Sequence, residues 1–281
     1  MTSKKILFTG GNGFIGRQVI PFIQEVGYEV IRPRSTQVRL EVDEEVATLF
    51  ADGQHYDAII HAAIVGGRRD ADDDYRVLYT NLNMFETLYK YVDQTDMFIN
   101  LDSGASYGRP APVEEPSPED FGKVIPGDPY GFSKYIIANR VLDNSKGVNL
   151  RIFGCFGEHE ENTRFFNTNI NRYIDGDPIQ LVKNRKMDFI FADDLYKIIK
   201  YYLDGNDGPR DVNCVYDRKY MLSDIAEIIN HLGPHKVDIQ TEGQYPTFPY
   251  TGKANNLPIE YDGLANGIRK VYEKYLCQRN V

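Results

Sequence analysis

The stretch Thr9-Gly10-Gly11-Asn12-Gly13-Phe14-Ile15-Gly16 follows a short apolar segment at residues 4–9 and precedes apolar residues at helical spacing. It therefore lies between a predicted strand and a predicted helix. Gly10 permits the tight turn, Gly13 lets the backbone approach a pyrophosphate, and Gly16 lets the helix pack closely on the sheet. The N-terminus of that helix offers free amides and a positive dipole to phosphate oxygens. This placement favours a dinucleotide-binding turn over a glycine-rich turn without a ligand.

Strand-like and helical segments alternate from this turn through about the first 155 residues. Further strands are predicted at residues 28–31, 58–63, 97–101 and 148–153, and further helices at residues 43–51, 81–93 and 129–144. The alternation indicates parallel strands joined by right-handed helical crossovers. The predicted fold class is α/β, with a doubly wound parallel Rossmann sheet and a smaller C-terminal substrate-binding lobe.

This alternation of strands and helices predicts that the chain has two structural parts. Residues 1–155 are predicted to form the dinucleotide-binding Rossmann domain, to which later segments return. Beyond Gly157 the alternation becomes irregular, and residues 156–281 are predicted to form mainly the smaller lobe. Its predicted helices are residues 163–175 and residues 223–232, the latter capped by Ser223.

The residues that follow the second predicted strand indicate which dinucleotide fits. They read Ile31-Arg32-Pro33-Arg34-Ser35. A site selective for NAD usually places Asp or Glu here, to bind the ribose 2'-hydroxyl. Two guanidinium groups and a hydroxyl instead suit a 2'-phosphate. We therefore predict that Arg32, Arg34 and Ser35 bind NADP(H), with NAD as the alternative.

A serine, a tyrosine and a lysine are predicted to share one site. Asp128-Pro129 begins a helix, because Asp accepts hydrogen bonds from free amides and Pro fits the first turn. Tyr130 and Lys134 then lie on one face, four positions apart, where the ammonium would lower the phenol pKa from about 10 toward neutrality. Ser103 follows the strand at residues 97–101, at the sheet edge where ligands bind in such folds.

These three residues have complementary chemistry. A tyrosine of this kind exchanges a proton with a carbonyl or hydroxyl oxygen, and Ser103 can hydrogen-bond that oxygen. A Tyr-x-x-x-Lys pair alone is usually a surface pair, but its order after the serine and the glycine loop is specific. Ser103, Tyr130 and Lys134 are therefore the predicted catalytic residues. His61 is interpreted as structural, because it ends a buried strand.

The composition excludes several classes of protein. The net charge is −9, and no Lys/Arg cluster offers the basic face that a nucleic acid needs. No apolar run is long enough to span a membrane and the N-terminus does not resemble a signal peptide, so a cytoplasmic protein without a membrane partner is expected. Three widely spaced cysteines without a Cys-x-x-Cys pair indicate neither disulfides nor zinc. The acidic run at residues 70–74 is interpreted as a solvated loop, and no metal site is predicted.

These motifs together resemble the extended short-chain dehydrogenases/reductases, a family of NAD(P)-dependent sugar epimerases, dehydratases and reductases. The resemblance covers essentially the whole chain. It rests on the glycine loop, His61-Ala62-Ala63, Asn81, Ser103 with Tyr107-Gly108, Tyr130-x-x-x-Lys134, Phe189-Ile190-Phe191-Ala192-Asp193-Asp194 and Val212-Asn213. It implies that the lysine also binds the nicotinamide ribose and that Asn81 supports the active-site helix or the cofactor. The region after residue 155 is expected to bind a nucleotide diphosphate sugar.

The resemblance and the motifs together define the expected binding residues. Cofactor contacts are expected from Gly10, Asn12, Gly13, Phe14, Ile15, Gly16, Arg32, Arg34, Ser35, Leu40, Ala62, Ala63, Asn81, Tyr130, Lys134 and Phe153. Substrate contacts are expected from Ser103, Gly104, Ala105, Arg164 and Arg185. Many relatives have an Arg near the substrate phosphates where this chain has Met187, and Arg185 or Arg164 is the expected substitute.

Within the family, residues 30–34 and 62–67 are most similar to enzymes of the GDP-fucose synthase type, which use NADPH to epimerise and then reduce a 4-keto sugar. Those enzymes epimerise with a Cys two positions after the catalytic Ser and a His in the substrate lobe. Here the corresponding positions are Ala105 and the region near Thr168. Dehydratases have an Asp-Glu pair directly after the catalytic residue, where this chain has Gly104-Ala105. The resemblance thus favours reduction without epimerisation or dehydration.

The predicted function is NADPH-dependent reduction of the 4-keto group of a nucleotide-activated deoxysugar, without inversion at C3 or C5. An NAD-dependent nucleotide-sugar 4-epimerase is the alternative enzyme. A non-catalytic NAD(P)-binding regulatory protein ranks lower. Such a protein is expected to lack Tyr130 or Lys134, and this chain has both.

A homodimer is also expected. Relatives usually dimerise through the helices that correspond to residues 81–93 and 129–144. The apolar residues on these helices that are candidates for the dimer interface are Phe85, Leu88, Tyr89, Ile136, Ile137 and Val141. The alternative is that all of these side chains face the sheet.

Overall fold

The computed structural model describes residues 4–67, 73–243 and 247–279, so part of the acidic run at residues 70–74 lies outside the described residues. A six-stranded parallel sheet forms its centre, in the order β2-β1-β3-β4-β5-β9. The strands are β1 (Lys5–Thr9), β2 (Glu29–Ile31), β3 (Ala58–His61), β4 (Phe98–Ser103), β5 (Gly147–Ile152) and β9 (Asp211–Cys214). This is the doubly wound α/β sheet that the alternation of strands and helices predicts.

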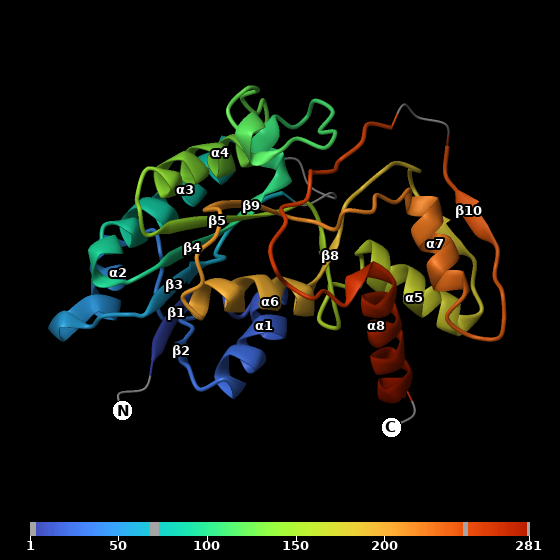
Figure 1. The fold of residues 1–281 in the computed structure, drawn as a ribbon, viewed down its shortest axis with the longest axis horizontal. Coiled ribbons are helices and arrows are strands. Elements are labelled where there is room, and N and C mark those ends of the chain that lie inside the picture. Colours follow the sequence, from blue (N-terminus) through green and yellow to red (C-terminus); the bar gives the residue numbers. More distant parts are fainter. Residues whose placement is uncertain (1–3, 68–72, 244–246, 280–281) are drawn as a thin grey trace.

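Helices cover both faces of this sheet (Figure 1). One face carries α1 (Phe14–Glu25) and α6 (Ala192–Leu203), and the other carries α2 (Asp43–Ala47), α3 (Tyr75–Tyr89) and α4 (Pro129–Leu142). The central strands are therefore buried on both faces, which explains why β3 and β4 are buried at every position. Among the described residues, none of the helices combines the length and apolar character that a membrane span requires.

A second core lies beside the carboxyl edge of the sheet (Figure 1). Its helices are α5 (Phe165–Asp175), α7 (Leu222–Asn230) and α8 (Gly263–Arg279), and its strands pair as β6 (Cys155–Phe156) with β8 (Ile190–Phe191) and β7 (Ile179–Leu181) with β10 (Ile239–Thr241). Buried aromatic and aliphatic side chains, among them Phe166, Ile170 and Ile268, hold this lobe together. Although α6 and β9 follow residue 155, they belong to the central sheet layers.

Several predicted boundaries were wrong. The helix expected at residues 81–93 begins at Tyr75, because the Asp74 side chain accepts a hydrogen bond from the Arg76 amide, and it ends at Tyr89. Ser223 does not cap α7: the cap position is Met221, and the Ser223 amide donates to Asn184 Oδ1.

The helix expected at residues 43–51 is interrupted. Its regular part, α2, ends at Ala47, and a 3-10 segment, Thr48–Gly53, follows. Asp52 in this segment has a left-handed backbone with φ of 56°, which no α-helix tolerates in its interior. Other 3-10 turns are Val92–Gln94, Gly104–Tyr107 and Pro118–Asp120.

Candidate active site

A cavity of about 790 Å³ runs along the carboxyl edge of the sheet, between the sheet and the second lobe. Ligands of doubly wound folds bind at this edge because the loops that follow the parallel strands meet there. The cavity extends from the glycine loop, past Ser103, to side chains of the lobe. Its lining includes most of the predicted cofactor residues: Gly10, Asn12, Gly13, Phe14, Ile15, Gly16, Arg34, Ser35, Leu40, Ala62, Ala63, Tyr130, Lys134 and Phe153.

The glycine loop has the close packing that its motif predicts. Gly10 has φ of +68°, and a Cβ on it would lie 2.7 Å from the backbone of Ala62. A Cβ on Gly16 would lie 2.3 Å from the Gly11 carbonyl oxygen. Gly13 precedes α1 and supplies no side-chain cap, so the first amides of that helix are available to an anionic ligand at the cavity.

Two expected cofactor residues lie outside the cavity lining. Arg32 is exposed and packs its Cβ beside Gly11. Asn81 is fully buried and bridges two elements: its side chain bonds the amide and carbonyl of Val65 and donates to Ser133 Oγ at 3.1 Å. Asn81 therefore supports α4, one of the two roles that the family resemblance implies.

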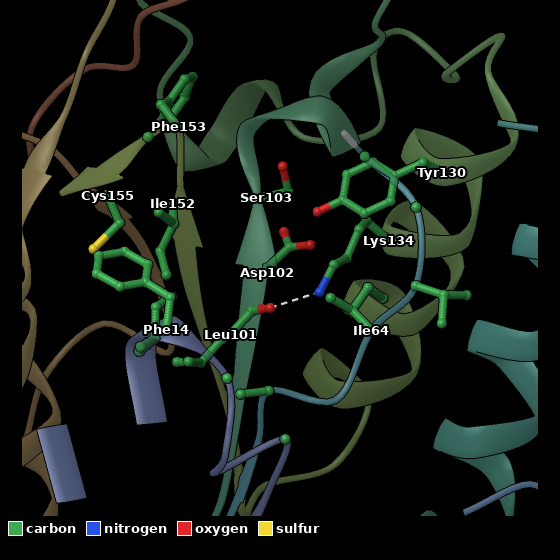
Figure 2. A pocket seen from close by; sticks show the side chains of 18 of the residues that line it. Phe14, Ile64, Leu101, Asp102, Ser103, Tyr130, Lys134, Ile152, Phe153 and Cys155 are labelled. Carbon is green, nitrogen blue, oxygen red and sulfur yellow. Dashed lines mark hydrogen bonds between the residues drawn. The ribbon is translucent and has the colours of Figure 1, made fainter. Parts of the chain in front are cut away.

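Ser103, Tyr130 and Lys134 are gathered at the middle of the cavity (Figure 2). Asp128 caps α4 by accepting from the Gly131 amide at 2.9 Å, which orients the first turns of the helix toward the end of β4. Ser103 Oγ accepts from the Ala105 amide at 3.2 Å, and Lys134 Nζ donates to the Leu101 carbonyl at 2.7 Å. The predicted trio is thus brought together.

The electrostatics of the trio differ from the sequence-based expectation. Burial raises the pKa of Tyr130, and the hydrogen bond with Ser103 only partly opposes this. Burial also lowers the pKa of Lys134 to about 8. The expectation that Lys134 brings the Tyr130 pKa toward neutrality was therefore wrong for this structure, because the cost of burying a phenolate exceeds the favourable charge contacts. The guanidinium that lies over the Tyr130 ring, 5.2 Å from its centroid, belongs to Arg109.

Sequence reasoning missed two side chains at the trio. Tyr250 lies with its phenol oxygen 3.4 Å from Ser103 Oγ, and its amide donates to the Lys186 carbonyl at 3.0 Å. Arg109 is held over Tyr130 by an ion pair with Asp128. Neither position has a periodic or motif signal in the sequence, since Tyr250 reaches the site from a distant segment and Arg109 from a loop.

At the substrate end, Arg164 and Arg185 both line the cavity. Arg185 is partly buried, which lowers its pKa, and it contacts Met187 Sδ at 3.4 Å. By contrast, Gly104 and Ala105 are buried in the turn behind Ser103 and do not line the cavity, which differs from the expectation that they contact substrate.

One further position and the metal-ligating side chains bear on the chemistry. Thr168 lies outside this cavity, with its hydroxyl on the Asn162 carbonyl. Within the described ranges, no group of three or more His, Cys, Asp or Glu side chains is arranged to hold a metal ion.

Comparison with known proteins supports an assignment at the level of the family. The model of the NAD dependent epimerase/dehydratase family matches residues 6–214. A putative UDP-glucose 4-epimerase from Methanocaldococcus jannaschii is 28% identical over 183 residues, which are 56% of this chain and 57% of that protein. A GDP-L-fucose synthase from Azorhizobium caulinodans is 32% identical over 120 residues, 41% of this chain and 38% of that protein. The chain thus matches less than two thirds of the length of either relative.

Among solved structures, a GDP-mannoheptose C4 reductase from Campylobacter jejuni with NADP bound superposes with a TM-score of 0.80. The superposition covers 98% of this chain and 99% of the reductase, at 15% sequence identity. At that identity the similarity establishes the shared fold.

Proposed function

Because the chain belongs to the NAD dependent epimerase/dehydratase family, we propose that it reduces the 4-keto group of a nucleotide-activated deoxysugar with NADPH. One observation carries the proposal. Ser103, Tyr130 and Lys134 meet in a cavity that continues to the glycine loop on one side and to Arg164 and Arg185 on the other. The residues expected to bind a dinucleotide and those expected to bind a nucleotide sugar therefore line one cavity with the same hydroxyl groups.

The chain's own residues account for the proton and the orientation. When bound, NADPH would supply the hydride that C4 of the sugar receives. Tyr130 donates its phenolic proton to the oxygen at C4, which Ser103 holds by a hydrogen bond. Lys134 binds the nicotinamide ribose and keeps a positive charge beside the phenol. Burial raises the pKa of Tyr130, so the phenol carries the proton that this direction of reaction uses.

NADPH is favoured over NADH by the cavity wall near the second strand. Arg34 and Ser35 both line this wall, and a guanidinium with a hydroxyl suits a 2'-phosphate. The C4 reductase from Campylobacter jejuni, which has the same fold, contains NADP. The diphosphate of the sugar nucleotide would be bound by Arg164 and Arg185, since guanidinium groups pair well with phosphate oxygens.

Reduction should occur without inversion at C3 or C5. Ala105 has no side-chain group that can donate or accept a proton and is buried, and Thr168 lies outside the cavity. The two positions at which related enzymes epimerise therefore offer no proton carrier to the sugar.

The direct test is a screen of 4-keto nucleotide sugars with NADPH, followed at the nicotinamide absorbance. Consumption of NADPH with at least one such sugar is expected. The product formed in deuterated water should carry no deuterium at C3 or C5 above the non-enzymatic background. Oxidation of NADPH with none of the sugars would contradict the proposal, and deuterium at either carbon would reveal an epimerising base.

A second candidate is an NAD-dependent nucleotide-sugar 4-epimerase, and one observation favours it. Glu41 also lines the cavity, next to Leu40, and a carboxylate is what an NAD site uses to bind ribose hydroxyls. Such an epimerase retains its cofactor through the reaction. Its signature would be protein purified with bound NAD that interconverts 4-epimers without added cofactor.

A further inference from the structure

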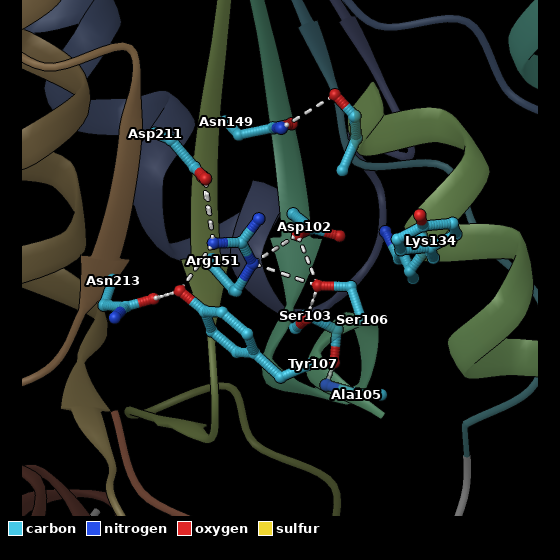
Figure 3. A network of polar contacts seen from close by, with 12 residues as sticks. Asp102, Ser103, Ala105, Ser106, Tyr107, Lys134, Asn149, Arg151, Asp211 and Asn213 are labelled. Carbon is cyan, nitrogen blue, oxygen red and sulfur yellow. Dashed lines mark hydrogen bonds and ion pairs between the residues drawn. The ribbon is translucent and has the colours of Figure 1, made fainter. Parts of the chain in front are cut away.

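A buried charge network lies directly behind the catalytic serine. Arg151 on β5 is fully buried, and its Nε donates to Asp102 Oδ2 at 2.8 Å. On its other side, Arg151 Nη1 lies 3.0 Å from Asp211 Oδ1. The rings of Tyr107 and Phe121 flank the guanidinium at 4.4 and 4.6 Å. This one cation is therefore shared by two carboxylates from the neighbouring strands β4 and β9 (Figure 3).

Asp102 occupies a particular place in this network. It directly precedes Ser103, its side chain is fully buried, and Ser106 Oγ donates to the same Oδ2 at 2.9 Å. Its other oxygen, Oδ1, is buried without a hydrogen-bond partner among the described residues. Figure 3 shows that the carboxylate lies between Arg151 and the side of the site that holds Lys134. Arg151 thus holds Oδ2 of Asp102 by a hydrogen bond. Oδ1 has no such partner, so the charge of the carboxylate can interact with groups in the active site.

The buried ammonium of Lys134 would be stabilised by a nearby negative charge. Its ammonium is buried, and its hydrogen bond to the Leu101 carbonyl brings no negative charge. The titratable side chains whose charges act on it are Asp102 from β4 and His61 from β3. Figure 2 also shows Tyr130, from its own helix, beside it. Burial keeps His61 and Tyr130 uncharged, since it lowers the pKa of His61 to about 3 and raises that of Tyr130. Asp102 is therefore the anion of this group.

We propose that Asp102, fixed by Arg151, is the counter-ion that keeps Lys134 protonated in its buried site. Asp102 is thus a positioning residue that acts through the lysine. The inference deepens the proposed function but depends only on the binding of a nicotinamide dinucleotide. A buried ammonium loses its proton easily, and a nearby negative charge opposes that loss. Asp211 pairs with the other side of Arg151 and does not serve as a counter-ion of Lys134.

The sign of the pH effect follows from these charges. Burial lowers the pKa of Lys134 to about 8, and Asp102 acts in the opposite direction. Without the Asp102 charge, Lys134 would become neutral at a lower pH. Because an ammonium binds ribose hydroxyls and attracts the phosphates better than an amine does, affinity for NADPH should fall as Lys134 loses its proton.

The experiment measures NADPH binding by fluorescence across pH, which requires no sugar substrate. In the wild type, affinity should fall on the order of tenfold as the pH rises through about 8, consistent with the loss of one charge-assisted hydrogen bond. In Asp102→Asn the fall should move to lower pH by about one unit, the usual influence of a close opposite charge. Lys134→Arg should abolish the fall over the same range, because a guanidinium stays protonated.

Asp211→Asn is the matched control. It removes a carboxylate from the same guanidinium, but on the side away from Lys134, so the midpoint should stay at the wild-type pH. Equal midpoints in Asp102→Asn and wild type, or equal shifts in both Asn variants, would overturn the inference. If Asp102→Asn fails to fold, Asp102→Asn/Arg151→Gln keeps the net charge of the network, and its midpoint should still lie below the wild-type pH, by less than one unit because a nearby positive charge is also removed. An absence of ketoreduction would refute the proposed function and leave this binding test intact.

Discussion

Tyr130 is the residue at which the buried environment matters most. The sequence predicts its contact with Ser103 and Lys134, because the Asp128-Pro129 start and the i, i+4 spacing are local features. The sequence does not predict its burial under Arg109 or its raised pKa, because the loop that carries Arg109 packs onto α4 only in the folded chain. The phenol therefore keeps its proton, and its burial makes the phenolate form costly.

Removal of this phenol should separate chemistry from binding. Tyr130→Phe keeps the ring and loses the proton donor, so turnover should fall by about 10²–10⁴-fold with NADPH affinity nearly unchanged. Steady-state rates and a fluorescence titration of NADPH measure the two effects. Tyr272→Phe, which removes a hydroxyl outside the cavity, should behave as wild type. A wild-type rate in Tyr130→Phe would refute the catalytic assignment.

The sequence predicts that Arg32 and Arg34 both bind the cofactor, but the structure distinguishes them. Both side chains are exposed, but Arg34 lines the cavity and Arg32 does not. Arg34→Ala should therefore weaken NADPH by roughly ten- to a hundred-fold, the value of a charge-assisted contact to phosphate, and should change NADH affinity little. Arg32→Ala serves as the control and should change neither. Equal losses of NADPH and NADH affinity in Arg34→Ala would contradict the assignment of the 2'-phosphate site.

At the scale of secondary structure, elements with local start signals were predicted well and the others were not. The glycine loop and α1, and the capped start of α4, are placed as the sequence indicates. The start of α3 at Tyr75 was missed, because its cap residue belongs to an acidic run that shows no helical periodicity. The paired strands of the second lobe were not predicted either, since β7 and β10 have three residues each and pair across a long stretch of chain.

The end of β3 gives a prediction about acid stability. His61 is buried between the rings of Phe85 and Phe98, and its Nδ1 lies 3.0 Å from Thr9 Oγ1. Burial lowers its pKa to about 3 in the folded chain, from 6.5. Between these values the unfolded chain binds a proton that the folded chain excludes, so stability must fall as the pH drops below about 6.5.

Urea unfolding at about pH 7 and about pH 5 tests this, and His61 should account for a loss of about 2 kcal/mol between the two. His61→Gln cannot take up that proton, so its free energy of unfolding should depend less on pH over this interval. His55→Gln, at an exposed histidine, should retain the wild-type dependence. The same pH dependence in His61→Gln as in wild type would show that other groups cause the acid effect.

For the whole molecule, the alternation of strands and helices was enough to predict the class of fold, because βαβ crossovers have one hand and parallel sheets need helices on both faces. It was not enough to predict how α6 and β9 return to the sheet after the chain has entered the second lobe. That return encloses the cavity between two cores. A later segment, which pairs at Tyr250 with Val113 and Met187, brings Tyr250 to Ser103, a contact between residues 147 positions apart that no local pattern could indicate.

The structure changes the residues on which the expected homodimer depends. Five of the apolar positions considered for a dimer interface face the core instead: Phe85, Leu88, Tyr89, Ile137 and Val141. The outer face of α3 nevertheless exposes Tyr75 at 74% and Tyr79 at 67%. Two tyrosines one helical turn apart give a partly apolar strip, and aromatic side chains are enriched where proteins associate.

We therefore still expect a homodimer, now with Tyr79 near the centre of its interface. Tyr79→Glu would place a charge in that apolar contact and should convert the dimer to a monomer at micromolar concentration, as measured by light scattering. Val182→Glu changes an equally exposed apolar residue in the second lobe and should leave the dimer intact. A wild-type monomer would remove the basis for an interface on α3, whereas a dimer that survives Tyr79→Glu would place the interface elsewhere.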